Sequence, residues 1–510
     1  MDPVVTTASG QVRGEAGSGV FVFRGIPYAA PPVGKLRFRP PAPPEGWTGV
    51  RDATVFGQAP PQCDFPLWVA SIVAPAVPKG EDCLNLNVWT PALGAEARLP
   101  VLVWIHGGGF LMGSGADDVY DGAAFARDGV VTVTLNYRLD ALGFLYVGGE
   151  GAGAFGLLDQ IAALEWVQEN IGAFGGDPGR VTVAGESAGS WSVSSLLAAP
   201  KARGVFRRAC AMSGAGHHHI PLKRAEWRAE QICAGLGVNR TDLEALQALP
   251  TDAILQASLA ANSGDAFGPD PEHHGPDPIR SWLHVAPVVG ADVLPERSID
   301  AVTRGAAAGI DMLVGHTLDE GRLFLLQEPT RAFTDSFGDD ATVAYAFGCA
   351  FGAKAAEALS RYSANRPNAT KFDLLSAVLG DLHFRMPAIR FAEQQSKHAN
   401  VHFYRFSWAS PLGDGALGCT HALELPFMFD TRGSTMSRKV NGADTPADLA
   451  DAMHRAWVAF IRDGDPNHDG LPTWPKYSGQ RPVMDFGAER RLLQNPTGDE
   501  TALWDDSPFL

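Results

Sequence analysis

The chain contains little cysteine and no long apolar run. Only six of its 510 residues are cysteine, which is too few for a disulfide scaffold. Neither the Cys-x-x-Cys nor the His-Glu-x-x-His spacing occurs, so the sequence predicts no metal site and no cofactor. No stretch of about 18 consecutive apolar residues is present, so we expect no membrane-spanning helix.

Positive charge is also scarce. Lys and Arg total 41 against 57 Asp and Glu, which gives a net charge of −16. Such a field repels the phosphate backbone of nucleic acids and anionic membrane surfaces. We therefore expect neither nucleic acid nor membrane as a partner.

The N-terminus begins Met1-Asp2-Pro3 and lacks a basic segment followed by an apolar run. This start predicts no secretory signal and a cytoplasmic location. A secreted form whose signal has been removed is the alternative.

The composition is that of a globular protein, with 45% hydrophobic and 19% charged residues. No internal repeat or low-complexity linker divides the chain. The region richest in structure-breaking residues is 262–280 (NSGDAFGPDPEHHGPDPIR), which predicts a long surface loop. We therefore expect one domain over residues 1–510, with 262–280 as an excursion from it.

Short runs of apolar and β-branched residues predict buried strands at 99–105 (LPVLVWI), 130–135 (VVTVTL) and 180–184 (RVTVA). Between the last two, apolar residues recur at helical spacing and predict a helix over 157–171. Further strands are predicted at 311–314 and 401–406, and a late helix at 450–461. Strands that alternate with helices favour an α/β fold whose central, mostly parallel sheet is covered by helices on both faces.

The most informative motif is Gly-Glu-Ser-Ala-Gly at 185–189, which follows the predicted strand at 180–184 and precedes a helix-competent stretch at 190–199. A serine at a sharp strand-to-helix turn is typical of the nucleophile elbow of α/β-hydrolases. The flanking glycines remove Cβ atoms that would clash there. In a chain with 57 glycines the motif alone can arise by chance. The strand before it and the helix after it favour Ser187 as a nucleophile.

A second motif, His-Gly-Gly-Gly-Phe at 106–110, follows the predicted strand at 99–105. Glycines let backbone N–H groups approach a negatively charged oxygen closely, as an oxyanion hole requires. A flexible turn and a phosphate-binding loop are the alternatives. The sequence contains no G-x-x-x-x-G-K-[ST] motif and its charge opposes phosphate, so we favour the oxyanion hole.

A serine hydroxyl needs a base to take its proton and a carboxylate to orient that base. In this fold the chain order is serine, acid, histidine. The chain has 14 histidines, so chemistry alone does not choose among them.

The motifs together resemble those of type-B carboxylesterases, the family that includes the cholinesterases and bacterial p-nitrobenzyl esterases. RVTVAGESAG resembles the family's active-site signature, and EDCLNLNVW at 81–89 resembles its second signature. The similarity extends to both ends of the chain, through FRGIPYAAPPVGKLRF at 23–38, NYRLDALGFL at 136–145, LLDQIAALEWVQENIGAFGGDP at 157–178, VGHTLDEG at 314–321, THALELPFMF at 420–429 and WVAFIRDGDPN at 457–467.

The resemblance implies a catalytic triad of Ser187, Glu320 and His421. It also implies that the backbone N–H groups of three further residues form the oxyanion hole, namely Gly108, Gly109 and Ala188. Ala422 replaces the glycine that usually follows the histidine, and Asp140 occupies a position that is usually small or uncharged. The family's first disulfide loop corresponds to the segment from Cys63 to Cys83, so the resemblance implies a disulfide between these two cysteines.

Two other groups of residues have competing interpretations. His217, His218 and His219 resemble a metal cluster, but consecutive side chains point in different directions, which favours a partly exposed loop. The resemblance offers a third interpretation, which we prefer to both: the chain after Met212-Ser213-Gly214 lines the family's acyl pocket, so His219 or Ile220 would contact the acyl group. Glu186, beside the proposed nucleophile, either supports the charge of the protonated histidine or is a structural carboxylate.

The sequence therefore predicts a serine carboxylesterase that forms an acyl-enzyme and prefers soluble esters with short to medium acyl chains. A specialised hydrolase of amides, carbamates or complex natural esters is the first alternative. A non-catalytic binding protein of the same fold is a remote one. The expected partner is a small ester substrate, and the expected state is a monomer or a small homo-oligomer.

Overall fold

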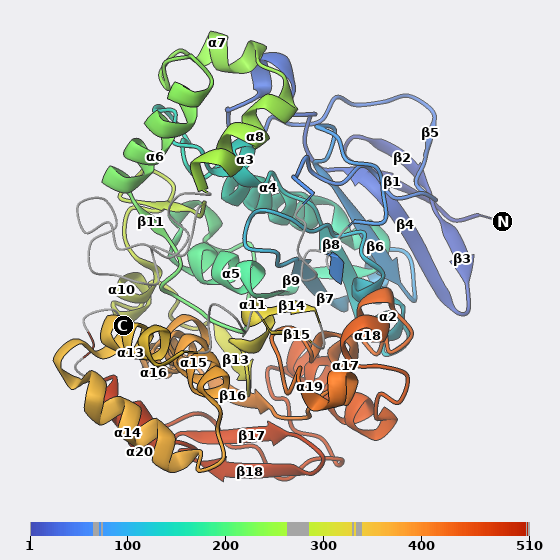
Figure 1. The fold of residues 1–510 in the computed structure, drawn as a ribbon. Helices are drawn as coiled ribbons and strands as arrows, with labels where there is room; N and C mark the ends of the chain where they lie inside the picture. The colour runs from blue at the N-terminus through green and yellow to red at the C-terminus, as the bar shows by residue number, and fades with distance from the viewer. Residues whose placement is uncertain are drawn as a thin grey trace.

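The computed structural model describes residues 2–64, 71–72, 75–262, 285–328, 331–332, 339–505 and 507 (Figure 1). Residues 263–280 of the predicted loop lie outside this part of the chain. Residue 262 is the last residue of the helix α8 (Thr251–Asn262).

An eleven-stranded sheet runs through the molecule, from the C-terminal strands at the bottom of Figure 1 to the N-terminal strands at its right. Six consecutive pairings are parallel, from β17 across to β8, and both edges are antiparallel. In spatial order the strands are β18 (Arg490–Gln494), β17 (Pro482–Phe486), β16 (Val401–Phe406), β13 (Asp311–Thr317), β10 (Arg208–Met212), β9 (Gly176–Glu186), β7 (Leu99–Ile105), β8 (Val131–Leu135), β6 (Asn85–Thr90), β4 (Val20–Pro27) and β3 (Glu15–Gly17). The prediction of a mostly parallel sheet is confirmed.

Three small sheets accompany the large one in the described residues. The first joins β1 (Val4–Thr7), β2 (Gly10–Arg13) and β5 (Val50–Asp52), the second joins β11 (Ile220–Pro221) to β12 (Val288–Val289), and the third joins β14 (Leu326–Glu328) to β15 (Arg331–Ala332).

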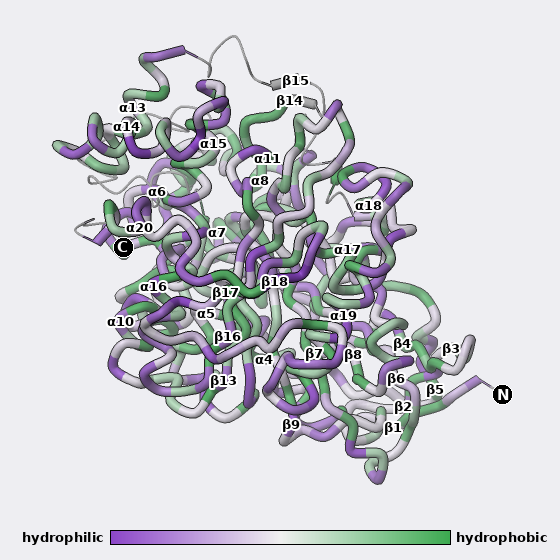
Figure 2. Tube along the Cα trace, turned by 90° about the horizontal axis from the view of Figure 1, so that it is seen from below, coloured by the Kyte–Doolittle hydropathy of each residue, from purple (hydrophilic) through white to green (hydrophobic). Residues whose placement is uncertain are grey.

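The central strands bury both of their faces because successive side chains point to opposite sides of a sheet. Val101, Val103 and Ile105 of β7 belong to one hydrophobic core. Leu102 and Trp104 of the same strand belong to a second core on the other face. Such near-continuous apolar runs are the pattern that a doubly covered parallel sheet requires. Figure 2 shows hydrophobic residues along the inner strands and hydrophilic residues on outer turns.

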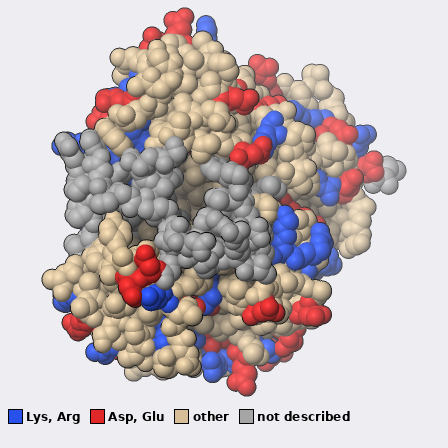
Figure 3. Space-filling model, in the orientation of Figure 1, with Lys and Arg blue, Asp and Glu red and all other residues tan. Residues whose placement is uncertain are grey.

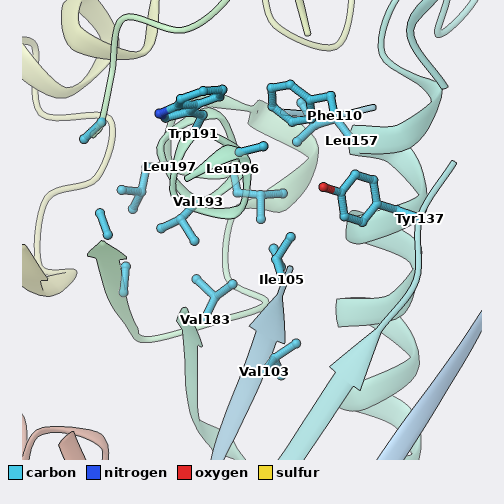
Figure 4. Packing of buried hydrophobic residues seen from close by; sticks show 14 of the residues in the cluster. Val103, Ile105, Phe110, Tyr137, Leu157, Val183, Trp191, Val193, Leu196 and Leu197 are labelled. Carbon is cyan, nitrogen blue, oxygen red and sulfur yellow. The ribbon is translucent and has the colours of Figure 1, made fainter. Parts of the chain in front are cut away.

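Helices cover both faces. The first core is covered by α4 (Phe155–Asn170), α5 (Ala188–Ala198), α10 (Ser298–Thr303) and α16 (Met386–Gln395). The second core is covered by α2 (Ala123–Arg127), α17 (Leu425–Met428), α18 (Thr435–Val440) and α19 (Ala447–Asp463). In Figure 4, Val193 and Leu196 of α5 lie above Val183 and Ile105 of the sheet.

The other α-helices of the described residues pack around these layers, and several of them add buried side chains to the first core. They are α3 (Asp140–Phe144), α6 (Leu222–Gly235), α7 (Leu243–Ala248), α11 (Arg322–Leu325), α13 (Asp340–Phe351), α14 (Ala355–Asn365), α15 (Lys371–Gly380) and α20 (Gly498–Leu503). No helix in the described residues is long and apolar enough to cross a membrane. Figure 3 shows acidic and basic side chains interspersed over the face in view, and basic side chains do not dominate that face.

Candidate active site

Ser187 stands at the turn where β9 ends and α5 begins. Its backbone is strained, with φ 56° and ψ −124°. Its N–H donates to the carbonyl of Met212 on β10 at 3.0 Å, and its own carbonyl accepts the N–H of Trp191 at 3.0 Å. The helix begins at Ala188, two residues before the start predicted from the sequence. The strand, the turn and the helix thus hold Ser187 at the C-terminal edge of the sheet, where α/β folds carry their sites.

The two glycines of the motif are required by close backbone contacts. A Cβ at Gly185 would lie 2.4 Å from the carbonyl carbon of Gly189, and a Cβ at Gly189 would lie 2.0 Å from the carbonyl oxygen of Ile105. Real Cβ atoms do not approach this closely. The turn therefore forms only where both positions lack a side chain.

The glycine-rich segment after β7 packs against Ser187. A Cβ at Gly107 would lie 3.2 Å from the Cβ of Ser187. Gly108 and Gly109 both have positive φ, 101° and 64°, a conformation that glycine adopts without steric cost. Ala188 is the first residue of α5 and is fully buried. The three residues proposed as oxyanion donors thus come from two segments that meet at the serine.

Glu320 and His421 are in direct contact. Glu320 follows β13, and its Oε2 lies 2.5 Å from Nδ1 of His421. Its other oxygen, Oε1, accepts the backbone N–H of Thr317 at 2.8 Å. Both side chains are buried. A carboxylate held in this way orients the imidazole and stabilises its protonated form.

Asp319, the carboxylate next to Glu320 in the chain, bonds to the backbone of Cys419. Its Oδ2 accepts the N–H of Cys419 at 2.9 Å, and its own N–H donates to the carbonyl of Cys419 at 2.9 Å. These two bonds align the loop that carries Glu320 with the loop that carries His421. The geometry therefore favours Glu320 over Asp319 as the acid.

The second nitrogen of His421 faces Glu186. Nε2 lies 3.0 Å from Oε1 of Glu186, within ion-pair distance. Within the described residues no hydrogen bond joins the Ser187 hydroxyl to His421. The structure brings acid and histidine together directly, and places the serine next to the residue that the histidine contacts.

The two carboxylates determine the protonation of His421. Burial alone lowers the pKa of the imidazole, but the charges of Glu186 and Glu320 outweigh burial and raise this pKa well above its usual value. Burial raises the pKa of the Glu320 carboxyl, but the charge of His421 outweighs that effect and the pKa lies below its usual value. The resting site therefore favours an imidazolium beside ionised Glu320.

Glu424 is a third carboxylate of this cluster that sequence reasoning missed. It is fully buried and its Oε1 accepts the hydroxyl of Tyr404 at 3.2 Å. Burial and the charges of Glu186 and Glu320 raise the pKa of Glu424 to about 8. The sequence places Glu424 three residues after His421, but this spacing alone does not show whether the two side chains point the same way.

The three consecutive histidines are buried, so the expectation of a partly exposed loop is wrong. His217, His218 and His219 are 4%, 2% and 2% exposed. The ring of His218 stacks on Trp191 with centroids 4.0 Å apart. Burial and neighbouring histidines lower the pKa of His218 well below its usual value. Packing against α5 buries the segment, and within the described residues no three histidine, cysteine or carboxylate side chains are arranged to hold a metal ion.

Aromatic rings connect this segment to the catalytic histidine. Phe384 lies 6.4 Å from His218 and 4.6 Å from His421, between ring centroids. Phe324 stacks on Phe384 at 5.6 Å. Phe324 and Phe384 thus form an aromatic wall beside His421.

The disulfide implied for Cys63 and Cys83 is not present, because both are free thiols in the structure. Cys83 packs in the first core of the sheet, whereas Cys63 packs in a separate cluster under α3 and α8. The Cys63 sulfur is instead 3.9 Å from Nε2 of Gln256.

Two other departures noted in the sequence have structural consequences. Ala422 has φ 65°, the left-handed conformation that explains why glycine is usual there. Asp140 also has a positive φ, 49°, and its buried Oδ1 accepts the hydroxyl of Ser258 at 2.5 Å and the N–H of Ala141 at 2.7 Å. Asp140 thereby ties α3 to α8.

Comparison with known proteins places the whole chain in one group. The model of the carboxylesterase family matches residues 1–504. The chain is 36% identical to the phenmedipham hydrolase of Pseudarthrobacter oxydans over 501 residues, which covers 96% of each protein. It is 37% identical to the para-nitrobenzyl esterase of Bacillus subtilis over 507 residues, which covers 98% of this chain and 97% of that protein.

Solved structures show the same fold. A carboxylesterase of Geobacillus stearothermophilus matches with a TM-score of 0.85 at 38% identity, over 98% of this chain and all of that one. A PNB esterase matches with a TM-score of 0.82 at 34% identity, over 99% of this chain and all of that one.

Proposed function

This chain belongs to the carboxylesterase family and is a carboxylic-ester hydrolase, and we propose that it acts through an acyl-enzyme on Ser187. The observation that carries the proposal is the position of His421, which lies between Glu320 and the residue adjacent to Ser187. A base that a carboxylate orients, beside a serine at a strained turn, is the arrangement that activates a hydroxyl.

In the proposed first step, His421 in its neutral form turns Nε2 from Glu186 to the Ser187 hydroxyl and takes its proton. The serine oxygen bonds to the ester carbonyl carbon, and the negative charge passes to the carbonyl oxygen. The N–H groups of Gly108, Gly109 and Ala188 stabilise that charge, as does the N-terminus of α5. The alcohol then leaves with the proton from His421.

In the second step, water gives its proton to His421 and attacks the acyl carbon. The tetrahedral intermediate collapses, Ser187 regains a proton, and the carboxylic acid leaves. Glu320 stabilises the imidazolium in both steps.

A fluorophosphonate probe tests the nucleophile. We expect one adduct per chain, located by mass spectrometry in the peptide that contains Ser187. Ser187→Ala should abolish both labelling and turnover. Ser195→Ala is the matched control, because Ser195 lies two turns further along α5 and, among the described residues, its hydroxyl bonds only to the Trp191 carbonyl. Labelling elsewhere in active enzyme would exclude Ser187.

We also propose a preference for soluble esters with short to medium acyl chains. Trp191, His218 and Phe384 stack on one another beside His421, and we take these rings as one wall of the acyl pocket. Each buried methylene contributes about 0.8 kcal/mol only while the pocket has room for it. Values of kcat/KM for p-nitrophenyl esters from acetyl to palmitoyl test the range, and a maximum at palmitoyl contradicts it. A carbamate and an anilide in the same panel test the alternative specificity.

We propose that the chain forms one catalytic domain. The first core contains both Val5 and Trp504, so the two ends of the chain contribute to one hydrophobic interior. A cytoplasmic location agrees with six cysteines that are all free. Light scattering on a sizing column tests the proposed monomer or small homo-oligomer.

A further inference from the structure

A cavity of about 440 Å³ lies behind Glu320, and neither Ser187 nor His421 lines it. It opens between the ends of β13 and β16 and the helices α15 and α16. Its volume falls within the range of small-molecule sites, about 300–1,000 Å³. The size and the separate lining indicate a second ligand site.

The cavity is rich in arginine although the chain as a whole is acidic. Five arginines line it against four carboxylates, whereas the whole chain has 41 basic and 57 acidic residues. The arginines are Arg322, Arg366, Arg385, Arg405 and Arg481. Guanidinium groups recognise carboxylates through paired N–H donors. Each of the five is paired with a carboxylate, so binding of an anionic ligand depends on the guanidinium donors that these pairs leave unused.

Arg405 has free donors for such a ligand. Within the described residues only its Nε makes a hydrogen bond, to Oδ1 of Asp485 at 2.8 Å. Asp485 also accepts from Nε of Arg491 at 3.3 Å, so one carboxylate serves two guanidinium groups. The side chain of Arg405 is 13% exposed. Its two terminal nitrogens are therefore available in a mostly enclosed space.

The floor beside Arg405 is apolar and aromatic. His316 is the partner of Arg405 in the register of β13 and β16. The ring of His316 lies 5.8 Å from that of Phe403, which lies 5.1 Å from that of Tyr477. Burial lowers the pKa of His316 to about 4, so this histidine adds no charge. A ligand with an apolar body and one negatively charged end fits this site, because the body can lie on the aromatic rings and the charged end can bind Arg405.

From these observations we propose that the cavity binds a small organic carboxylate, with its carboxylate on Arg405 and its body on Phe403 and Tyr477. This is also the chemical class of the acid that ester hydrolysis releases. The ligand acts on the reaction through the wall that it shares with Glu320.

His316 and Thr317 form the wall between the cavity and Glu320. Nδ1 of His316 lies 2.7 Å from the carbonyl of Thr317, and the N–H of Thr317 holds Glu320 at 2.8 Å. A ligand that shifts His316 thus displaces the donor that orients the proposed catalytic acid. This coupling rests on the proposed function, whereas binding to Arg405 does not.

Benzoate is a suitable probe, and isothermal titration of enzyme blocked at Ser187 with a fluorophosphonate tests the site. We expect benzoate to bind the blocked enzyme, and Arg405→Gln to weaken binding at least about tenfold. Arg491→Gln is the matched control, because Arg491 contacts the same Asp485 but does not line the cavity. Absence of binding to the blocked enzyme, or equal binding by Arg405→Gln, overturns the proposal.

A second variant tests the site independently, in case Arg405→Gln fails to fold. Ala377→Leu adds bulk to the cavity from α15 without touching an ion pair, and it should also abolish binding. In unblocked wild-type enzyme, benzoate should lower kcat about fivefold, because it displaces the donor that orients Glu320. A change in KM alone would place benzoate at the ester site and overturn the coupling. If Ser187→Ala retained activity while benzoate still bound, the proposed nucleophile would fail and the cavity site would stand.

Discussion

Oε1 of Glu186 lies 3.0 Å from Nε2 of His421, so the imidazole is held between two carboxylates. This contact occupies the nitrogen that must face the Ser187 hydroxyl during the reaction. Glu186 is the residue directly before Ser187 in the chain. Two adjacent residues of the elbow, Glu186 and Ser187, therefore compete for the same nitrogen of His421.

The first prediction is that Glu186→Gln moves the acid limb of the pH profile to lower pH. His421 must be neutral to accept the serine proton, and Glu186 and Glu320 together raise its pKa against the effect of burial. Activity is therefore lost as pH falls through this raised pKa. Removing one of the two charges lowers the pKa, so kcat/KM persists to lower pH.

Above the acid limb, Glu186→Gln should reduce kcat about tenfold, because the imidazolium formed in the reaction loses one stabilising charge. The measurement is kcat/KM and kcat against pH. Glu165→Gln is the control, since Glu165 is an exposed carboxylate on α4. An acid limb that does not move assigns Glu186 a purely structural role.

The second prediction separates the two carboxylates of the Asp319-Glu320 pair. Glu320→Gln keeps the shape of the side chain but no longer stabilises imidazolium, and kcat should fall by about 10³–10⁴-fold. Asp319→Asn should stay within about tenfold of wild type, because an amide oxygen can still accept the Cys419 N–H. Steady-state kinetics of the two variants decide the assignment, and the reverse order would identify Asp319 as the acid.

The third prediction concerns Asp140, whose pKa burial raises from 3.8 to about 6. Because the folded pKa is raised, its contribution to stability is fully present below about pH 4 and is lost as pH rises through 6. At pH 8 the buried charge therefore destabilises the fold, by about 3 kcal/mol for a shift of this size.

Asp140→Asn removes that charge and suits the positive φ, which asparagine tolerates. We expect the variant to have a higher apparent Tm than wild type at pH 8 and the same Tm at pH 4. Asp444→Asn, at an exposed position, should change neither value. Equal melting of Asp140→Asn and wild type at pH 8 would show that the carboxyl remains protonated there.

The fourth prediction is that the six cysteines remain thiols in purified protein. Burial raises the pKa of the Cys83 thiol far above its usual value, so little of the reactive thiolate forms. Thiol titration of denatured protein should give six groups with or without prior reduction. Two fewer groups in the unreduced sample, with Cys63 and Cys83 identified by peptide mapping as the two that escape labelling, would demonstrate the bridge that the family resemblance implies.

The sequence alone determined the local elements of the site. The strand at 99–105 coincides with β7, and the helix predicted over 157–171 corresponds to Phe155–Asn170. The elbow was readable for the same reason, because strand, turn and helix are specified by consecutive residues. The resemblance added Glu320 and His421, which lie too far from Ser187 in the chain for spacing to connect them.

Only the tertiary structure decided the contacts between distant segments. His421 meets Glu186 across 235 positions because β9 and the loop after β16 end at the same edge of the sheet. Cys63 and Cys83 lie close in sequence yet pack in different clusters. The burial of the three histidines, the high pKa of Glu424 and the cavity behind Glu320 likewise depend on packing. Side-chain direction and desolvation follow from which surfaces meet, and a linear pattern of residues does not specify that.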